Sequence, residues 1–351
     1  MEERRNIDTC DAAYAVSLRA EGKKPLSINL KSNQRIDYLR LSITDRCNLR
    51  CIYCQPVDRN QFFTRNEVLR YEEMARLVNV FVELGVKKVR ITGGEPLIKK
   101  NVTSLIRMLR EIRGLEDISM TTNGVYLKDM AYQLKEAGLD RVNISLDTLR
   151  KVKYISITGR DCFEDVWAGI HKALEVGLNP VKLNVVVMKG INDDELLDFV
   201  RLTLEYPLIV RFIEFFPTDR LSKELVDYVI RSCEIKEKIV DCFGEMRRDL
   251  RIRGNGPAMY YRLKESIGPI GFISGFSSNF CNACNRIRVD CTGRLSPCLF
   301  SGYILDFKRV LRSENWRERL PGYIRDVFEM KSLYSKNRMN INKIEMSSIG
   351  G

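Results

Sequence analysis

The sequence predicts an α/β protein in which a parallel sheet covered by helices forms the larger part of the chain and a smaller domain follows it. From Tyr38 onward, short β-rich runs alternate with longer amphipathic runs of helical period. Parallel strands need long crossovers that are usually helical, so six such strands indicate a parallel sheet. After Pro217 the alternation stops, and turn residues interrupt shorter β-rich runs. A chain of 351 residues is long enough for two domains.

The elements of the larger domain are expected in regular alternation. We expect strands over residues 38–43, 87–92, 117–122, 141–146, 181–188 and 208–216. We expect helices over residues 71–85, 101–112, 127–138, 163–177 and 193–206. Gly85, Gly138 and Gly177 end three of these helices, as glycines that follow a helix C-terminus often do. Residues 1–33 show no core pattern and are interpreted as a variable extension, so the predicted domains are residues 34–217 and 218–351.

Charge and hydropathy exclude several classes of protein. No uncharged apolar run approaches the ~20 residues of a membrane helix, and the N-terminus MEERRNID carries charge where a signal peptide would be apolar. We therefore expect a cytoplasmic protein with no membrane partner. The net charge of +12 favours an anionic partner, either a phosphorylated small molecule or a nucleic acid. No basic block with interleaved aromatic residues supports a nucleic acid.

Cysteine usage points to metal binding. Eleven cysteines in a reducing compartment argue against a disulfide framework, and the single histidine, His171, lies in a helical run as an ordinary surface residue would. Cys47, Cys51 and Cys54 follow the first predicted strand closely, and no fourth ligand lies nearby. A closed zinc site needs four ligands, whereas three thiolates can hold a cubane iron–sulfur cluster and leave one iron open. The first group therefore predicts an iron–sulfur centre at the carboxyl end of a parallel sheet.

A second cysteine group lies in the smaller domain, in FCNACNRIRVDCTGRLSPCLF. Its four cysteines are Cys281, Cys284, Cys291 and Cys298, and they are compatible with a zinc ribbon. However, NRIRVD alternates like a strand, so Arg286, Arg288 and Asp290 would share one face and Cys291 would lie on the other. In that interpretation three ligands remain, as in the first group.

The first group and two later motifs resemble the radical S-adenosylmethionine superfamily. The motifs are the C-x3-C-x2-C triplet, TGGEP after the second strand and NISLD at the fourth. The resemblance implies that Cys47, Cys51 and Cys54 hold a [4Fe–4S] cluster whose open iron chelates the methionine part of S-adenosylmethionine. It also implies three further contacts with this cofactor: Tyr53 near the adenine, Gly94 in the segment that holds the amino group, and Ser145.

The second group is similar to that of one family, the GTP 3′,8-cyclases, which begin molybdenum cofactor biosynthesis. The resemblance covers residues 34–351 and includes LRLSITDRCN, CNRIR, LNVVVMKGIND and the terminal SSIGG. It implies an incomplete (β/α)6 TIM-like barrel with a smaller C-terminal α+β domain. A second [4Fe–4S] cluster, on Cys281, Cys284 and Cys298, would bind the guanine base of GTP.

The resemblance also assigns roles to individual residues. GTP contacts fall on Arg40, Arg90, Thr121, Lys182, Arg211, Arg286, Ile287 and Arg288. Arg40 is also expected to be catalytic, together with the terminal Gly350 and Gly351, which would enter the active site. Phe216 stands at a cofactor position where the family usually has methionine. The stretch 218–238 lacks the glycine-containing form expected from the family, and its role is left open.

The activity implied is the conversion of GTP to (8S)-3′,8-cyclo-7,8-dihydroguanosine 5′-triphosphate. A 5′-deoxyadenosyl radical would take hydrogen from C3′, and the ribose radical would attack C8. The expected partners are flavodoxin or ferredoxin as electron donor, the downstream cyclic pyranopterin monophosphate synthase, and a second copy of the chain. Two alternatives remain at this point. One is another radical enzyme with an auxiliary cluster, such as a peptide maturase, and the other is a metal-containing regulator that binds nucleic acid.

Overall fold

The structure is a computed structural model that describes residues 36–54, 62–216, 227–252, 256–277, 284–298 and 303–336. Five parts of the sequence-based expectations lie outside these ranges. They are the N-terminal extension (residues 1–33), residues 218–226 of the stretch 218–238, Cys281, Gly350 and Gly351. The other candidate site residues are all described.

The centre of the molecule is a parallel sheet of six strands that lie side by side in chain order. The strands are β1 (Tyr38–Ser42), β2 (Lys88–Thr92), β3 (Asp117–Thr122), β4 (Arg141–Ser145), β5 (Lys182–Val187) and β6 (Ile209–Glu214). All six expected strands are confirmed, with ends that differ by one or two residues. Apolar residues of the strands pack in one continuous core with those of the helices.

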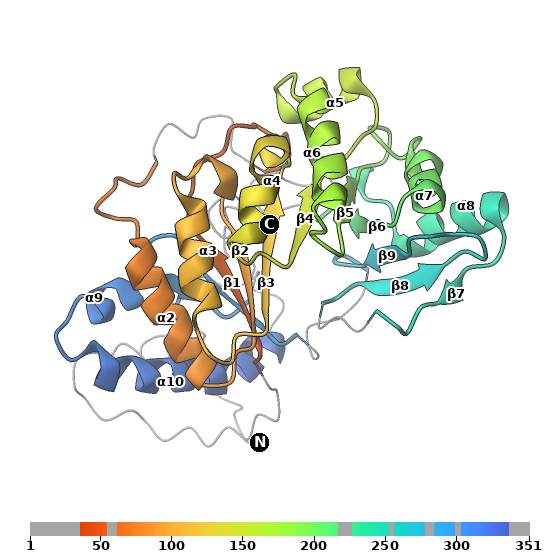
Figure 1. Ribbon diagram of the computed structural model, residues 1–351. Coiled ribbons are helices and arrows are strands. Elements are labelled where there is room, and N and C mark those ends of the chain that lie inside the picture. Colours follow the sequence, from red (N-terminus) through yellow and green to blue (C-terminus); the bar gives the residue numbers. More distant parts are fainter. Residues whose placement is uncertain are drawn as a thin grey trace, which may run out of the picture.

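Helices connect these strands and cover one face of the sheet (Figure 1). The five expected helices are found as α2 (Tyr71–Glu83), α3 (Val102–Arg110), α4 (Leu127–Glu136), α6 (Phe163–Glu175) and α7 (Leu196–Glu205). In α2, Met74, Leu77, Val78 and Phe81 are buried, which is the i, i+3, i+4, i+7 stripe of a helix that packs against a core. Gly85, Gly138 and Gly177 all have positive φ, as their expected position after a helix requires.

Besides the C-terminal helices, three helical segments of the described chain were not expected. They are the 3-10 turn η1 (Pro96–Ile98), α5 (Lys151–Thr158) and α8 (Ser232–Phe243). The sequence of α5, KVKYISIT, is rich in β-branched residues that favour strands, but burial of Tyr154 and Ile157 on one side supports a helix. Part of α8 falls within the stretch 218–238, and the backbone N–H of Ser232 donates to Glu214 Oε1 at the end of β6 (2.7 Å).

The strands after residue 217 extend both edges of the same sheet. β9 (Ile270–Ile273) pairs in parallel with β6, and β8 (Met259–Arg262) and β7 (Arg247–Arg248) follow it outward. At the other edge β10 (Arg286–Val289) pairs in parallel with β1, and β11 (Arg294–Ser296) and β12 (Leu305–Asp306) follow. Within the described residues, twelve strands form one sheet that is not closed, which agrees with the expected incomplete barrel. The distant β10 is therefore the direct neighbour of β1.

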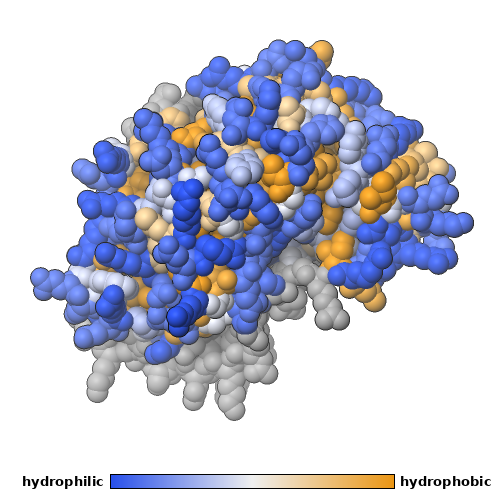
Figure 2. All heavy atoms as spheres, in the orientation of Figure 1, coloured by the Kyte–Doolittle hydropathy of each residue, from blue (hydrophilic) through white to orange (hydrophobic). Residues whose placement is uncertain are grey.

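The C-terminal helices α9 (Phe307–Leu311) and α10 (Trp316–Lys336) lie beside α2 (Figure 1). Phe81 of α2 packs against two aromatic rings: its ring centroid lies 5.9 Å from that of Phe307 and 6.2 Å from that of Phe328. None of the described helices is both long and apolar enough to cross a membrane. Figure 2 shows a mainly hydrophilic face with apolar residues scattered in small groups.

Candidate active site

One cavity of about 690 Å³ collects nearly all the described site residues. This volume falls in the range of small-molecule binding sites. The cavity is lined by Arg40, Cys47, Cys51, Tyr53, Cys54, Arg90, Gly94, Thr121, Ser145, Lys182, Arg211, Phe216, Cys284, Arg286, Arg288 and Cys298. The side chain of Ile287 is instead fully buried in the hydrophobic core, because residues of a strand alternate between faces. Any contact of Ile287 with a ligand in the cavity would come from its backbone.

A row of arginines crosses three neighbouring strands at one level of the cavity. Arg288 on β10 is the register partner of Arg40 on β1, and Arg40 is the partner of Arg90 on β2. Burial lowers the pKa of Arg40 well below its usual value, and Arg288 and Arg90 add to this effect. Burial likewise lowers the pKa of Arg90 and that of Arg288 to about 10. Arginine side chains are not deprotonated in proteins, so the row holds concentrated positive charge.

Lys182 and Arg211 continue the basic lining on β5 and β6. Burial, followed by the charge of Arg211, lowers the pKa of Lys182 to about 6. The Nζ of Lys182 donates to the hydroxyl of Tyr260 (3.4 Å), and Arg211 donates to Asn184. Within the described residues, Nε of Arg211 and Oγ1 of Thr121 are buried without a hydrogen-bond partner. Unsatisfied buried donors beside concentrated positive charge fit an anionic ligand with many acceptor oxygens.

The acidic side chains that line the cavity are engaged with other groups. Glu95 accepts hydrogen bonds from the Thr122 hydroxyl (2.7 Å) and from the backbone of Asn123 (2.6 Å). Glu214 accepts from Ser277 and from the backbone of Ser232. These two carboxylates thus bind the loops that surround the cavity.

The first cysteine group occupies the loop after β1. Cys47 Sγ accepts hydrogen bonds from the backbone N–H of Leu49 (3.4 Å) and from Nδ2 of Asn123 (3.8 Å). Burial raises the pKa of Cys47 to about 11 and raises that of Cys51. Without a metal these thiols are therefore protonated, and a metal would have to displace the protons.

The three thiols of the first group face one cavity. In the described part of the chain, no three Cys, His, Asp or Glu side chains converge closely enough to hold one metal ion. Nevertheless, Cys47, Cys51 and Cys54 all line the same cavity. Ligands of a cubane cluster bind separate irons at its corners, so they lie farther apart than ligands of one ion. A donor set of three thiolates fits an iron–sulfur cluster.

The glycines of TGGEP hold the loop of the first cysteine group. The backbone N–H of Gly94 donates to Thr44 O (2.7 Å), and that of Glu95 donates to Arg46 O (2.7 Å). A Cβ atom on Gly94 would lie 2.1 Å from Arg46 O, so only glycine allows this approach. The expectation was that the glycines admit a ligand. The structure adds that Gly94 is required for contact between two loops of the protein itself.

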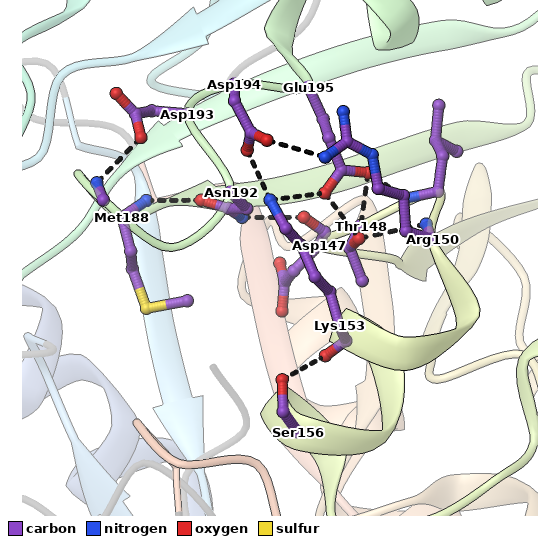
Figure 3. Close-up of polar contacts among 12 residues, drawn as sticks. Asp147, Thr148, Arg150, Lys153, Ser156, Met188, Asn192, Asp193, Asp194 and Glu195 are labelled. Carbon is purple, nitrogen blue, oxygen red and sulfur yellow. Dashed lines mark hydrogen bonds and ion pairs between the residues drawn. The ribbon is translucent and has the colours of Figure 1, made fainter.

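Sequence reasoning missed Asp147, which fixes the aromatic residue of the first motif. The hydroxyl of Tyr53 donates to Asp147 Oδ2 (2.6 Å), and the backbone N–H of Val186 donates to Asp147 Oδ1 (2.8 Å). Asn192 Nδ2 donates to the backbone oxygen of Asp147 (2.7 Å), as Figure 3 shows. Burial raises the pKa of Asp147 to about 6. The available signal was its position two residues after Ser145, where an acidic side chain would face the same side.

Glu195 supports the segment that carries Asp147. It is fully buried and accepts hydrogen bonds from the Thr148 hydroxyl (2.7 Å) and from the backbone N–H of Leu149 (2.7 Å). Lys153 lies 3.3 Å from the same carboxylate (Figure 3). The loops after β4 and β5 are therefore joined by polar contacts on the side of the cavity where Tyr53 lies.

The described cysteines of the second group lie in two different environments. Cys284 and Cys298 line the cavity, whereas Cys291 is fully buried elsewhere, and burial raises its pKa to about 12. Burial alone would raise the pKa of Cys284, but Lys331 and Arg286 hold it below its usual value. The expectation for Asp290 was wrong. The strand ends at Val289, and the Asp290 carboxylate turns to Thr292 and Arg294 instead of facing the cavity.

Comparisons with known proteins agree with this site. The family described as "Radical SAM superfamily" matches residues 41–203, and the family described as "Molybdenum Cofactor Synthesis C" matches residues 208–336. Among solved structures, SuiB of Streptococcus suis bound to S-adenosylmethionine has a TM-score of 0.59. Its sequence is 15% identical, and the match covers 83% of this chain and 68% of SuiB, so the likeness concerns the fold. Fold and site define a radical S-adenosylmethionine protein.

Curated relatives define the family more narrowly. The GTP 3′,8-cyclase of Petrotoga mobilis is 48% identical over 327 residues, which cover 92% of this chain and 99% of the relative. That of Desulforamulus reducens is 44% identical and covers 91% of this chain and 98% of the relative. The GTP 3′,8-cyclase of Moorella thermoacetica is 49% identical over 80% of this chain and 86% of the relative. The chain belongs to the GTP 3′,8-cyclase family of radical S-adenosylmethionine enzymes.

Proposed function

We propose that this chain converts GTP to (8S)-3′,8-cyclo-7,8-dihydroguanosine 5′-triphosphate, the first step of molybdenum cofactor biosynthesis. One observation carries the proposal: a buried row of Arg288, Arg40 and Arg90 in a cavity that cysteines from both groups also line. Family membership supports the same activity. A triphosphate supplies the negative charge and the acceptor oxygens that guanidinium groups bind.

The basic residues would bind and orient GTP. Guanidinium groups make paired hydrogen bonds to phosphate oxygens. Arg288, Arg40 and Arg90 provide three such groups on the neighbouring strands β10, β1 and β2. Lys182 and Arg211 would bind from the opposite strands, and the free Oγ1 of Thr121 among the described residues offers a further hydrogen bond. Arg286 and the backbone of Ile287 complete the set that family resemblance assigns to GTP. Arg40, in the middle of the arginine row, is the residue of this set that we assign a catalytic role.

The cysteines would hold two [4Fe–4S] clusters. Cys47, Cys51 and Cys54 would ligate the first, and Cys284 and Cys298 with Cys281 the second. Together with bound S-adenosylmethionine, the first cluster would supply one-electron radical chemistry, with the electron coming from an external donor. The chain's own contribution is to hold the substrate in place and to exclude water from a cavity that is mostly enclosed by protein. Tyr53, Gly94, Ser145 and Phe216 would contact S-adenosylmethionine.

Other parts of the proposal rest on the family alone. Gly350 and Gly351 would reach the active site and take part in catalysis. Flavodoxin or ferredoxin would donate electrons, and cyclic pyranopterin monophosphate synthase would consume the product. We expect a homodimer in the cytoplasm. No nucleic acid or membrane is needed for this activity.

The alternative of a peptide maturase has one observation in its favour. The fold is similar to that of SuiB, which has been solved with its precursor peptide SuiA, at a TM-score of 0.55 and 16% identity. A peptide substrate would not require three arginines in one buried row. The arginine row therefore favours GTP over a peptide.

Product analysis would test the proposal. The reconstituted full chain is incubated anaerobically with GTP, S-adenosylmethionine and a strong reductant. The products are then separated by chromatography and identified and quantified by mass spectrometry. We expect 5′-deoxyadenosine and the cyclic nucleotide in equal amounts, and no cyclic product without S-adenosylmethionine. Cleavage of S-adenosylmethionine that GTP neither stimulates nor couples to a cyclic product would contradict the assignment of GTP as the substrate.

A further inference from the structure

A buried lysine lies beside the second cysteine group and has no role in the function proposed above. Lys331 is 3% exposed and lines the cavity from helix α10. Its Nζ lies 3.7 Å from Cys284 Sγ and 2.6 Å from the backbone oxygen of Pro297. Pro297 directly precedes Cys298, so one ammonium group contacts both described arms of this cysteine group.

Lys331 carries its ammonium group in buried surroundings, which is unfavourable unless other groups compensate for the lost solvation. Burial of an ammonium group costs several kcal/mol unless hydrogen bonds and opposite charge compensate for it. In the part of the chain that the structure describes, no carboxylate lies within ion-pair distance of Lys331. Among the described neighbours of Lys331, the cysteine sulfurs can offer negative charge once they are thiolates bound to iron.

We propose that Lys331 is a positioning residue for the second cluster that also raises its reduction potential. Its bond to Pro297 O fixes the distance between the arms that carry Cys284 and Cys298. Its charge and its N–H donor lie next to a ligating sulfur. Hydrogen bonds to the sulfurs and nearby positive charge both favour the reduced, more negative state of an iron–sulfur cluster. This inference rests on the proposed function, since it requires a second cluster.

The test measures the second cluster alone. In a full-length chain with Cys47, Cys51 and Cys54 all changed to Ala, the cluster that remains can be followed by electron paramagnetic resonance during a redox titration, without GTP or S-adenosylmethionine. Lys331→Met removes the charge and the donor at similar size. Lys331→Gln keeps a donor without charge, and Lys331→Arg keeps both.

We expect a more negative midpoint potential in Lys331→Met, a smaller shift in Lys331→Gln, and a potential close to that of the parent in Lys331→Arg. Iron retained after gel filtration should fall in the same order, with the largest loss in Lys331→Met. Lys135→Met is the matched control, because Lys135 also donates to a backbone carbonyl, that of Gly177 (2.8 Å), on the exposed surface. The control should change neither quantity.

Two outcomes would overturn the inference about Lys331, and a third would also overturn the proposed function. A midpoint potential and iron content unchanged in both Lys331→Met and Lys331→Gln would show that Lys331 does not act on the cluster. An equal shift in Lys135→Met would show that the effect is not specific to Lys331. If the parent chain with the three cysteine changes holds no cluster, the proposed function is itself wrong at the second cysteine group.

Discussion

The hydroxyl of Tyr53 lies 2.6 Å from Oδ2 of Asp147, although 94 positions of sequence separate the two residues. Tyr53 stands between the cysteines of the first group, and Asp147 lies in the loop that follows β4. This hydrogen bond joins the cysteine loop to the barrel. It gives the loop a defined position before any cofactor is bound.

Removal of this bond should weaken binding of S-adenosylmethionine while the first cluster is retained. A hydrogen bond to a charged group contributes about 1.5–3 kcal/mol, so Tyr53→Phe should weaken binding roughly tenfold or more. Asp147→Asn should have a similar effect, and the double variant should be little worse than either single one. Anaerobic equilibrium dialysis with labelled S-adenosylmethionine measures the affinities. Additive losses in the double variant would show that the two residues act independently.

GTP binding should be coupled to uptake of a proton by Lys182. Burial and the nearby arginines lower the pKa of Lys182 to about 6, so it is mostly neutral in the free protein at about pH 8. A bound triphosphate favours the charged form and raises this pKa, which draws a proton from the buffer. At about pH 5 Lys182 is already charged, and the uptake should disappear.

Calorimetry in buffers of different ionisation enthalpy measures this uptake. At about pH 8, the observed heat for the parent chain should depend on the buffer with a slope that approaches one proton per GTP. Lys182→Arg is the matched variant, because arginine is always charged and takes up no proton. A buffer-independent heat in the parent chain would contradict the prediction.

The cysteine assignments predict iron content. The parent chain should hold ~8 iron atoms after anaerobic reconstitution, as expected for two [4Fe–4S] clusters. Changing Cys47, Cys51 and Cys54 together to Ala should leave about half of the iron and no cleavage of S-adenosylmethionine. Cys298→Ala should also halve the iron content but should still cleave S-adenosylmethionine. Cys291→Ala should keep the full iron content. Loss of a cluster from Cys291→Ala would reverse the assignment of the ligands.

Gly94→Ala should destabilise the protein even without a cofactor. The added Cβ would lie 2.1 Å from the backbone oxygen of Arg46, and backbone cannot move aside as a flexible side chain can. We expect a loss of about 1–3 kcal/mol, and roughly 2–4 °C in melting temperature for each kcal/mol. Gly322→Ala, in helix α10 with open space around the new Cβ, is the control and should melt no earlier. Circular dichroism of both apo variants gives the comparison.

The local pattern of the sequence predicted the six parallel strands because apolar residues repeat with one period in strands and with a different period in helices. Helix α5 was missed because its β-branched residues oppose the state that tertiary packing imposes. The family resemblance predicted which arginines belong to the site, but not that β10 would be the neighbour of β1. Pairing between distant segments leaves no local pattern. The contact of Lys331 with Cys284 was missed for the same reason, because α10 begins far along the chain from that cysteine.

Strand β10 has a consequence for how the chain is made. Asn285, next to β10, contacts Asp37, next to β1, across 248 positions of sequence. At about 5–20 residues per second, a ribosome needs roughly 12–50 s to synthesise that stretch. During this time one edge of β1, the strand that carries Arg40, has no strand beside it and can pair with other chains. Slow synthesis or delayed release would therefore favour aggregation of this protein before its C-terminal strands can cover that edge.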